Sequence, residues 1–178
     1  MIMKNSFLVV LLTLLSLTAC NDAKFNRYPG TKLDSIPLEF RGVFMDPDKK
    51  SKTGNMIFVE KNYWMESNKG TKEYLSDSMV LSVYKGAYYL STLDDNQKYW
   101  YILHLKTSGK DLLLYPILYD DKKAKGGNSI TKYFTPQLDT DSNYVFTMDE
   151  EKLLEYTAND LMKEESMKLK RAKPTKRK

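Results

Sequence analysis

Residues 79–93 read MVLSVYKGAYYLSTL, and this stretch decides the fold. Apolar residues alternate with others over 79–83, Lys85-Gly86 interrupts them, and apolar and aromatic residues resume over 88–93. A period of two places apolar side chains on one face of a β-strand, and a short connection containing Gly is typical of a hairpin. We therefore expect two antiparallel strands joined by a tight turn.

The same pattern continues along most of the chain. Stretches rich in apolar and aromatic residues are separated by turn-forming stretches rich in Asp, Asn, Gly, Lys and Pro. The further strand candidates are 38–45, 56–66, 99–106, 112–119 and 130–135. Short strands with turns at intervals of roughly 8–12 residues indicate a β-sandwich or an up-and-down barrel.

The periodicity changes once, near the C-terminus. Thr147 and Glu150 have the spacing of a capping box, and a helix is predicted over about 149–164. Its apolar stripe consists of Leu154, Ala158, Leu161 and Met162. Beyond it, Met167 and Leu169 flank Lys168, so this segment either forms a final strand on the sheet or frays from the helix. The fold class expected is mainly β, a small antiparallel up-and-down barrel or half-barrel with one C-terminal helix.

The first twenty residues have the layout of an export signal. Residues 1–4 are short and positively charged, and 7–17 are an apolar run (FLVVLLTLLSL). Such a run would rise about 16 Å as a helix, roughly half of a bilayer's hydrocarbon core, which suits a signal peptide better than a membrane span. The run ends in Leu17-Thr18-Ala19-Cys20, which resembles the lipobox of bacterial lipoproteins.

That resemblance implies a signal peptide over 1–19 and lipidation at Cys20, with a further acyl chain such as palmitate on the new amino terminus. Cys20 is the chain's single Cys. Two or three acyl chains, at about 0.8 kcal/mol per buried methylene, would hold the protein permanently on a membrane. Asn21 replaces the Asp that retains enteric-type lipoproteins at the inner membrane, so we expect the outer membrane of a Gram-negative cell. The alternative is an ordinary secretory peptide cut near Ala19, with Cys20 left as a free thiol.

Composition divides the rest of the chain. Residues 20–35 are polar, contain Pro29-Gly30 and lack periodicity, so a flexible tether is expected there. A single β-rich domain follows over 36–170, and a disordered basic tail over 171–178. With 29% charged and 12% aromatic residues, the chain is neither intrinsically disordered nor a polytopic membrane protein.

The basic excess belongs to the C-terminal end. Residues 163–178 hold eight basic and two acidic residues, while the mature chain before them is close to −2. Such a tail would contact anionic headgroups or lipopolysaccharide phosphates, or simply be a solvated end. Nucleic acid is not an expected partner of an exported lipoprotein.

The first strand carries a second resemblance. Phe40-Arg41-Gly42-Val43-Phe44 is similar to the opening strand of lipocalin-like domains, in which a Gly-x-Trp places its aromatic ring at the base of the barrel. Phe44 stands here at the Trp position. The chain also looks like the small, Lys- and Tyr-rich lipoproteins of Bacteroidetes-type bacteria, many of them uncharacterised. A lipocalin-like barrel implies an interior ligand site.

Few residues indicate catalysis. His104 is out of phase with Leu103 and Leu105, so it is expected on the strand surface rather than as a base. Three carboxylate pairs, Asp46/Asp48, Asp94/Asp95 and Asp120/Asp121, lie in turn-like stretches, where Asp accepts backbone hydrogen bonds.

The stretch from Asp139 to Glu150 places oxygen ligands at the spacing of a calcium loop. Tyr144, however, stands at the sixth position, where that loop needs Gly, so a turn followed by a strand is favoured. No metal or cofactor is expected.

Aromatic side chains form the remaining candidates. Tyr63-Trp64, Tyr88-Tyr89 and Tyr99-Trp100-Tyr101 each place one ring inside and one outside a sheet, either as core packing or as the lining of a ligand site.

Two functions from different classes fit these observations. The first is a lipid-anchored binding or accessory module, not an enzyme, for a small apolar ligand or an envelope protein, with ligand-binding residues that the sequence does not identify. The alternative is a carboxylate-based hydrolase acting on cell-envelope or exogenous polysaccharide. An enclosed cavity of a few hundred Å³ would favour ligand binding inside the barrel, and a filled interior would favour an interaction module.

Overall fold

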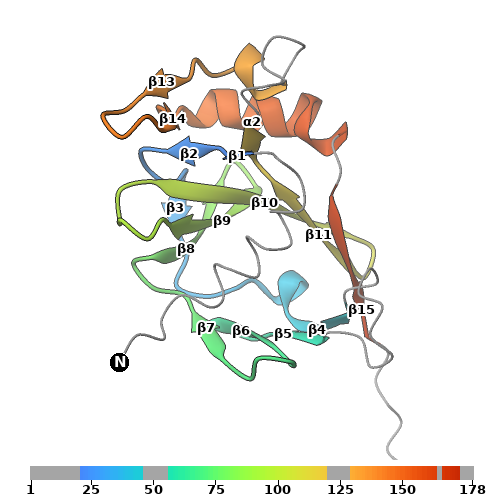
Figure 1. Ribbon diagram of the computed structural model, residues 1–178. Coiled ribbons are helices and arrows are strands. Elements are labelled where there is room, and N and C mark those ends of the chain that lie inside the picture. The colour runs from blue at the N-terminus through green and yellow to red at the C-terminus, as the bar shows by residue number, and fades with distance from the viewer. Residues whose placement is uncertain (1–20, 46–55, 120–128, 164–165, 173–178) are drawn as a thin grey trace, which may run out of the picture.

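The structure is a computed structural model that describes residues 21–45, 56–119, 129–163 and 166–172 (Figure 1). The predicted signal peptide over 1–19, Cys20, and the carboxylate pairs Asp46/Asp48 and Asp120/Asp121 lie outside these residues.

The described chain is mainly β, with one C-terminal α-helix, α2 (Glu150–Asn159), which a turn of 3₁₀-helix, η4 (Leu161–Lys163), follows. The other short helices are η1 (Leu38–Phe40) and η3 (Ser129–Lys132). The strands are β1 (Asn21–Asp22), β2 (Lys24–Phe25), β3 (Thr31–Lys32), β4 (Gly42–Met45), β5 (Met56–Val59), β6 (Tyr63–Glu66), β7 (Lys72–Tyr74), β8 (Met79–Tyr84), β9 (Ala87–Leu93), β10 (Trp100–Ser108), β11 (Asp111–Pro116), β12 (Leu118–Tyr119), β13 (Gln137–Leu138), β14 (Tyr144–Phe146) and β15 (Met167–Arg171).

The predicted hairpin over 79–93 is confirmed as β8 and β9. Lys85 and Gly86 connect them with φ values of 46° and 82°. Positive φ at both central residues belongs to a type I′ turn, whose twist matches that of the flanking strands.

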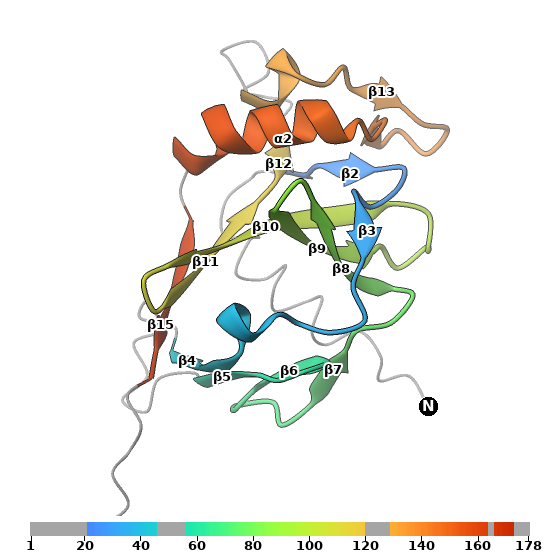
Figure 2. The same cartoon turned by 180° about the vertical axis from the view of Figure 1, so that it is seen from behind.

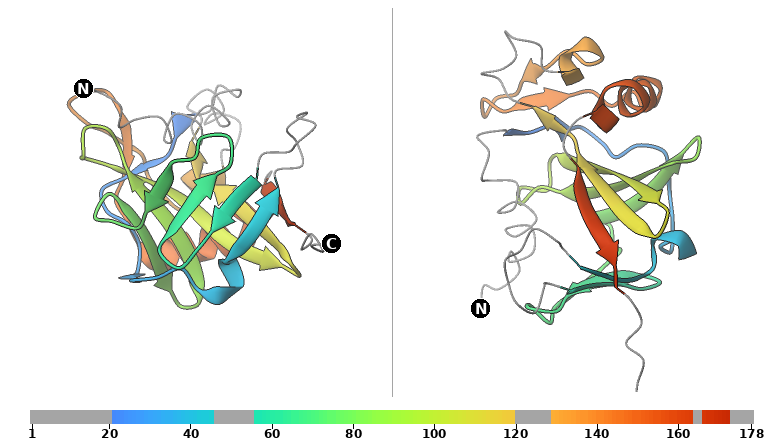
Figure 3. Two further views of the ribbon diagram at one scale, coloured as in Figure 1. Left: turned by 90° about the horizontal axis from the view of Figure 1, so that it is seen from below. Right: turned by 90° about the vertical axis from the view of Figure 1, so that its right-hand side faces the viewer.

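An antiparallel sheet curls into a half-barrel, which confirms the predicted fold class. Its strand order is β3-β8-β9-β10-β11-β15-β4-β5-β6-β7, so two meanders are joined through β15, the last strand of the described chain. Figure 3 shows β15 running between the β8–β11 layer and the β4–β7 layer. This order is that of an up-and-down barrel in which β15 pairs with both β11 and β4, and which is open between β7 and β8, since no pairing joins these two strands among the described residues.

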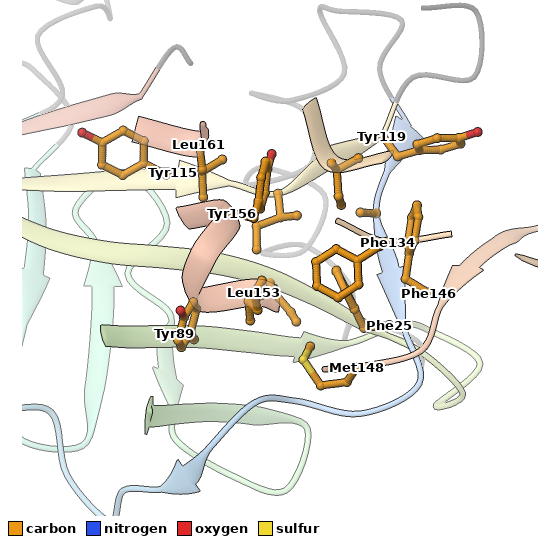
Figure 4. Packing of buried hydrophobic residues seen from close by; sticks show 14 residues of the cluster. Phe25, Tyr89, Tyr115, Tyr119, Phe134, Phe146, Met148, Leu153, Tyr156 and Leu161 are labelled. Atoms are coloured by element: carbon orange, nitrogen blue, oxygen red, sulfur yellow. The ribbon is translucent and has the colours of Figure 1, made fainter. Parts of the chain in front are cut away.

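The β8–β11 sheet is covered on both faces. Helix α2 lies across one face (Figures 1 and 2). Its Leu153 and Tyr156 belong to one buried cluster with Ile102 and with Tyr89, which Figure 4 shows beside Leu153. The other face packs against the β4–β6 layer and η1. The hydrophobic cluster buried on this side of the sheet, between the two layers, consists of Ile36, Phe40, Phe44, Val59, Trp64, Leu81, Leu90, Leu103, Leu105, Leu112, Leu114 and Leu169.

The N-terminal segment is part of the domain, so the predicted tether over 20–35 and the domain start near residue 36 are wrong. Ala23 and Phe25 are fully buried. The Phe25 ring lies 5.5 Å from that of Phe134 and 5.6 Å from that of Phe146, and β2 pairs with both β10 and β14. Strands of only two residues carry no detectable periodicity, and for this reason the sequence pattern did not reveal them.

The helix differs from the prediction in its cap and its buried face. Asp149, not Thr147, is the N-cap, and its carboxylate accepts a hydrogen bond from the Lys152 backbone N–H. The side chains buried against the sheet are those of Leu153, Tyr156 and Thr157. The buried face of α2 is therefore displaced by about one residue from the predicted stripe, and of the four stripe residues Leu161 alone is buried.

The final strand confirms one of the two interpretations of residues 167–169. Leu169 pairs with Leu112 of β11, and Lys170 pairs with Met45 of β4. Arg171 still belongs to β15, so the disordered tail does not begin at residue 171 as predicted; residues 173–178 lie outside the described chain.

The Arg171 side chain connects β15 to neighbouring elements. Its guanidinium donates to the carbonyl oxygens of Arg41 (2.6 Å), Glu39 (3.2 Å) and Lys110 (3.0 Å), and lies 4.7 Å from the centre of the Phe44 ring. One side chain thus links β15 to η1, to β4 and to the β10–β11 turn.

Gly42 makes room for that guanidinium, and Gly42→Ala is expected to destabilise the fold. Gly42 has φ 141°, and a Cβ there would lie 2.2 Å from Nη1 of Arg171. We expect a loss of about 1–3 kcal/mol from backbone strain, plus the displaced hydrogen bonds of Arg171. Urea unfolding would measure it.

Gly70→Ala is the matched control, because Gly70 has φ 65° and an added methyl group there would meet no atom within 4 Å, so this variant tests strain alone. Equal losses in the two variants would contradict a role for Arg171, as would an unchanged Gly42→Ala effect in an Arg171→Met background.

Candidate functional site

The interior of the half-barrel is filled by side chains. Between the two sheet layers the enclosed space is about 20 Å³, room for about one water molecule. Apolar side chains surround it together with Glu73, whose pKa is raised by burial. No lipid-sized ligand fits here, so the lipocalin-like interior site is not a candidate.

A larger groove lies outside the half-barrel, where β9 and β10 separate. Their ladder ends at the pair Tyr88–Leu105, although β8 continues to pair with β9 as far as Ala87 and β10 with β11 as far as Ser108. The groove opens at this divergence, between the β8–β9 turn, the end of β10, η1 and α2. Its volume is about 420 Å³, within the range of small-molecule sites.

One wall of the groove is a row of side chains on α2 and η4. Leu154, Ala158 and Met162 follow one another at intervals of four residues, which places them in line along the helix. Leu154 is half-buried, and Ala158 and Met162 are exposed. The apolar stripe of the sequence therefore has a place in the structure, but it faces the groove rather than the core.

The charged groups at the groove differ in their pairing. Lys85, at one end, pairs with the Glu151 carboxylate, which also accepts a hydrogen bond from Tyr84. Lys106 Nζ lies 3.2 Å from the sulfur of Met162. Thioether sulfur is a weak acceptor, and no ion pair of Lys106 is found among the described residues.

His104 lines the groove but is not the surface residue that we predicted. Its side chain is buried, since α2 covers the face of β10 that would otherwise meet solvent. Nδ1 lies 3.2 Å from the Tyr88 carbonyl oxygen, which makes Nδ1 the protonated nitrogen. Burial, aided by the charge of Lys106, lowers the pKa of His104 to about 4. The ring is therefore neutral at pH 7.

The Asp139 loop is a turn, as favoured from the sequence. Oδ1 of Asp139 accepts the backbone N–H groups of Asp141 (2.9 Å) and Asn143 (2.8 Å), while Oδ2 accepts the Tyr99 hydroxyl (2.8 Å). Burial acts to raise the pKa of the Asp139 carboxyl, but these hydrogen bonds outweigh it and lower the pKa. Glu150 turns away from this loop to pair with Arg27.

Of the three predicted carboxylate pairs, Asp94/Asp95 lies among the described residues, and its Asp94 has a structural role. Oδ1 of Asp94 accepts the backbone N–H groups of Lys98 (2.7 Å) and Tyr99 (3.1 Å) and so holds the turn before β10. Across the described ranges, no group of three or more His, Cys, Asp or Glu side chains is placed to hold a metal ion.

The adjacent aromatics Tyr88 and Tyr89 point to opposite faces of β9, and both of these faces are covered. Tyr89 is buried under α2, while Tyr88 packs edge-on against Phe40 at 4.9 Å. Trp64 is buried in the half-barrel interior, and its neighbour Tyr63 contacts Tyr74 at 5.4 Å.

Sequence reasoning did not identify Lys106 or the β9–β10 divergence as features of a site. The sequence signal that lies nearest to the site is the row Leu154, Ala158 and Met162, which belongs to the apolar stripe predicted for the helix and lines the groove. A scan against protein-family models, a search of curated proteins and a search of solved structures found no match to this chain.

Proposed function

We propose that this protein is a lipid-anchored binding module of the cell envelope and that the groove beside α2 is its ligand site. The observation that carries the proposal is that the half-barrel is filled, whereas outside it lies an open groove of about 420 Å³ with a wall formed by half-buried Leu154 and exposed Ala158 and Met162. Apolar walls with a few polar groups are typical of ligand sites. The ligand is a small apolar molecule or an apolar segment of an envelope protein.

Cys20 supplies the anchor in this proposal, on the strength of its lipobox-like context. Among the described residues, no helix has the length and apolar character to cross a bilayer. The proposed location is the outer membrane of a Gram-negative bacterium.

Cys20→Ser is expected to abolish both fatty-acid labelling and sedimentation with membranes, because the thiol is the attachment point. Metabolic labelling with palmitate, followed by membrane fractionation, measures both. A variant that still incorporates label would overturn the lipid anchor.

Groove binding can be measured with N-phenyl-1-naphthylamine, a neutral apolar dye that fluoresces in apolar surroundings. All described helices and strands lie within 21–172, so residues 21–178 retain the described fold. Ala158→Trp should fill the groove and weaken dye binding about tenfold, or about 1.4 kcal/mol.

The control is Glu155→Trp, which adds the same ring to an exposed position of α2 that does not line the groove. Equal dye binding by wild type and both variants, or no dye binding at all, would count against the groove as the site.

The competing hydrolase gains no support from this groove. Glycoside hydrolysis needs two carboxyl groups at a fixed separation. Glu39 is the one carboxylate among the described residues that line the groove, and it lies beside the Tyr88 hydroxyl.

A further inference from the structure

We propose that the groove selects an aliphatic carboxylate, with its alkyl chain along the α2 row and its acid group at Lys106. This inference rests on the proposed function and adds the chemical class of the ligand. Two observations support it: Lys85 at the groove is paired with a carboxylate whereas Lys106 contacts a thioether sulfur, and the apolar row on α2 and η4 runs from one lysine to the other.

The two ends of the groove are electrically different. Lys85 is paired with Glu151, three residues before Leu154, so that end is neutralised. Lys106 contacts Met162 at the other end, and within the described chain no carboxylate lies within 4.0 Å of its ammonium group. The Lys106 ammonium group can therefore pair with one negative charge of a ligand at the Met162 end of the groove.

The apolar row matches an alkyl chain. Met162 follows Leu154 by eight positions, which corresponds to a rise of about 12 Å along a helix. The row starts beside the neutralised pair and ends at the sulfur that touches Lys106. A medium-length chain laid on this wall would bring its terminal acid group to the ammonium.

The remaining polar groups at the groove do not compete for this role. His104 donates Nδ1–H to the Tyr88 carbonyl and is neutral at pH 7. Thr157 donates its hydroxyl to the Leu154 carbonyl at 2.9 Å, and Glu39 lies beside the Tyr88 hydroxyl. A positive charge that has no carboxylate partner in the described part of the chain, beside an apolar wall, favours a monoanion over a neutral or a cationic amphiphile.

The test is displacement of N-phenyl-1-naphthylamine from residues 21–178 by decanoate and by decan-1-ol, at pH 7.5 and low salt. The two competitors share a chain length and differ in charge. Because Lys106 is exposed, decanoate is expected to displace the dye at about three- to fivefold lower concentration than decanol.

Lys106→Met should remove that preference and leave decanol displacement unchanged, because methionine retains the apolar stem without the charge. Lys110→Met is the matched control, since Lys110 is an exposed lysine in the β10–β11 turn outside the groove, and it should keep the preference.

The outcomes separate this inference from the proposed function. Equal displacement by the two competitors, or a preference that survives Lys106→Met, overturns the carboxylate assignment while the groove remains a binding site. Dye that binds neither wild type nor Glu155→Trp overturns both proposals.

Discussion

Phe44→Ala is expected to lower the free energy of unfolding by about 3–5 kcal/mol, a large share of a small domain's stability. The Phe44 side chain is fully buried in β4 and belongs to the cluster between the two sheet layers. Truncation removes its apolar contacts and leaves a cavity that the surrounding strands cannot close completely. It also removes the ring on which the Arg171 guanidinium lies, at the point where β15 joins β4.

Met45→Ala is the control for this experiment. Met45 is the next residue of β4, and its side chain is 40% exposed. Its truncation should cost less than about 1 kcal/mol, as for most surface substitutions. Denaturant unfolding of both variants provides the comparison. A loss below about 1 kcal/mol for Phe44→Ala would show that the buried face of β4 is assigned incorrectly.

Acidification is expected to cost about 3 kcal/mol of stability through His104 alone. Its pKa is about 4 in the folded protein, lowered by burial, against an ordinary value of 6.5. Between these pH values the unfolded chain binds a proton that the folded protein excludes. Stability therefore falls as pH decreases from about 6.5 towards 4, and a difference of 2.5 pKa units corresponds to about 3 kcal/mol.

Comparison of wild type with His104→Gln isolates this contribution. Urea unfolding at several pH values from 7.5 to 5 should show a loss in wild type about 2 kcal/mol greater than in the variant. Other titrating groups are common to both proteins and cancel in the difference. Parallel pH profiles for the two proteins would mean that His104 is accessible to solvent in the folded state, as would a pKa near 6.5 in an NMR titration of the imidazole.

Local sequence patterns predicted two kinds of element: strands in which alternate residues are apolar, and turns whose residue types favour a particular backbone conformation. The β8–β9 hairpin is marked by alternation and by Lys85-Gly86, and both signals depend on neighbouring residues. The Asp139 and Asp94 turns were predicted for the same reason, because Asp hydrogen-bonds to backbone groups a few residues away.

Patterns failed where burial depends on a distant segment. His104 was assigned to the surface because alternation assumes one exposed face, whereas α2 covers that face of β10. The helical stripe was assigned one residue out of phase because Leu154, Ala158 and Met162 form an apolar row of their own. The core face is instead chosen by how Leu153 and Tyr156 meet the sheet.

By itself the sequence determined the β-rich class, the main hairpin, the late helix and the lipobox-like context of Cys20, since each is written in residues close together in the chain. The tertiary structure decided the place of β15 between β11 and β4 and the burial of Phe25. It also decided the groove at Lys106. These features join residues up to 132 positions apart, as in the contact of Arg171 with Glu39. Periodicity reports which side of an element is apolar, but only the folded chain shows what covers that side.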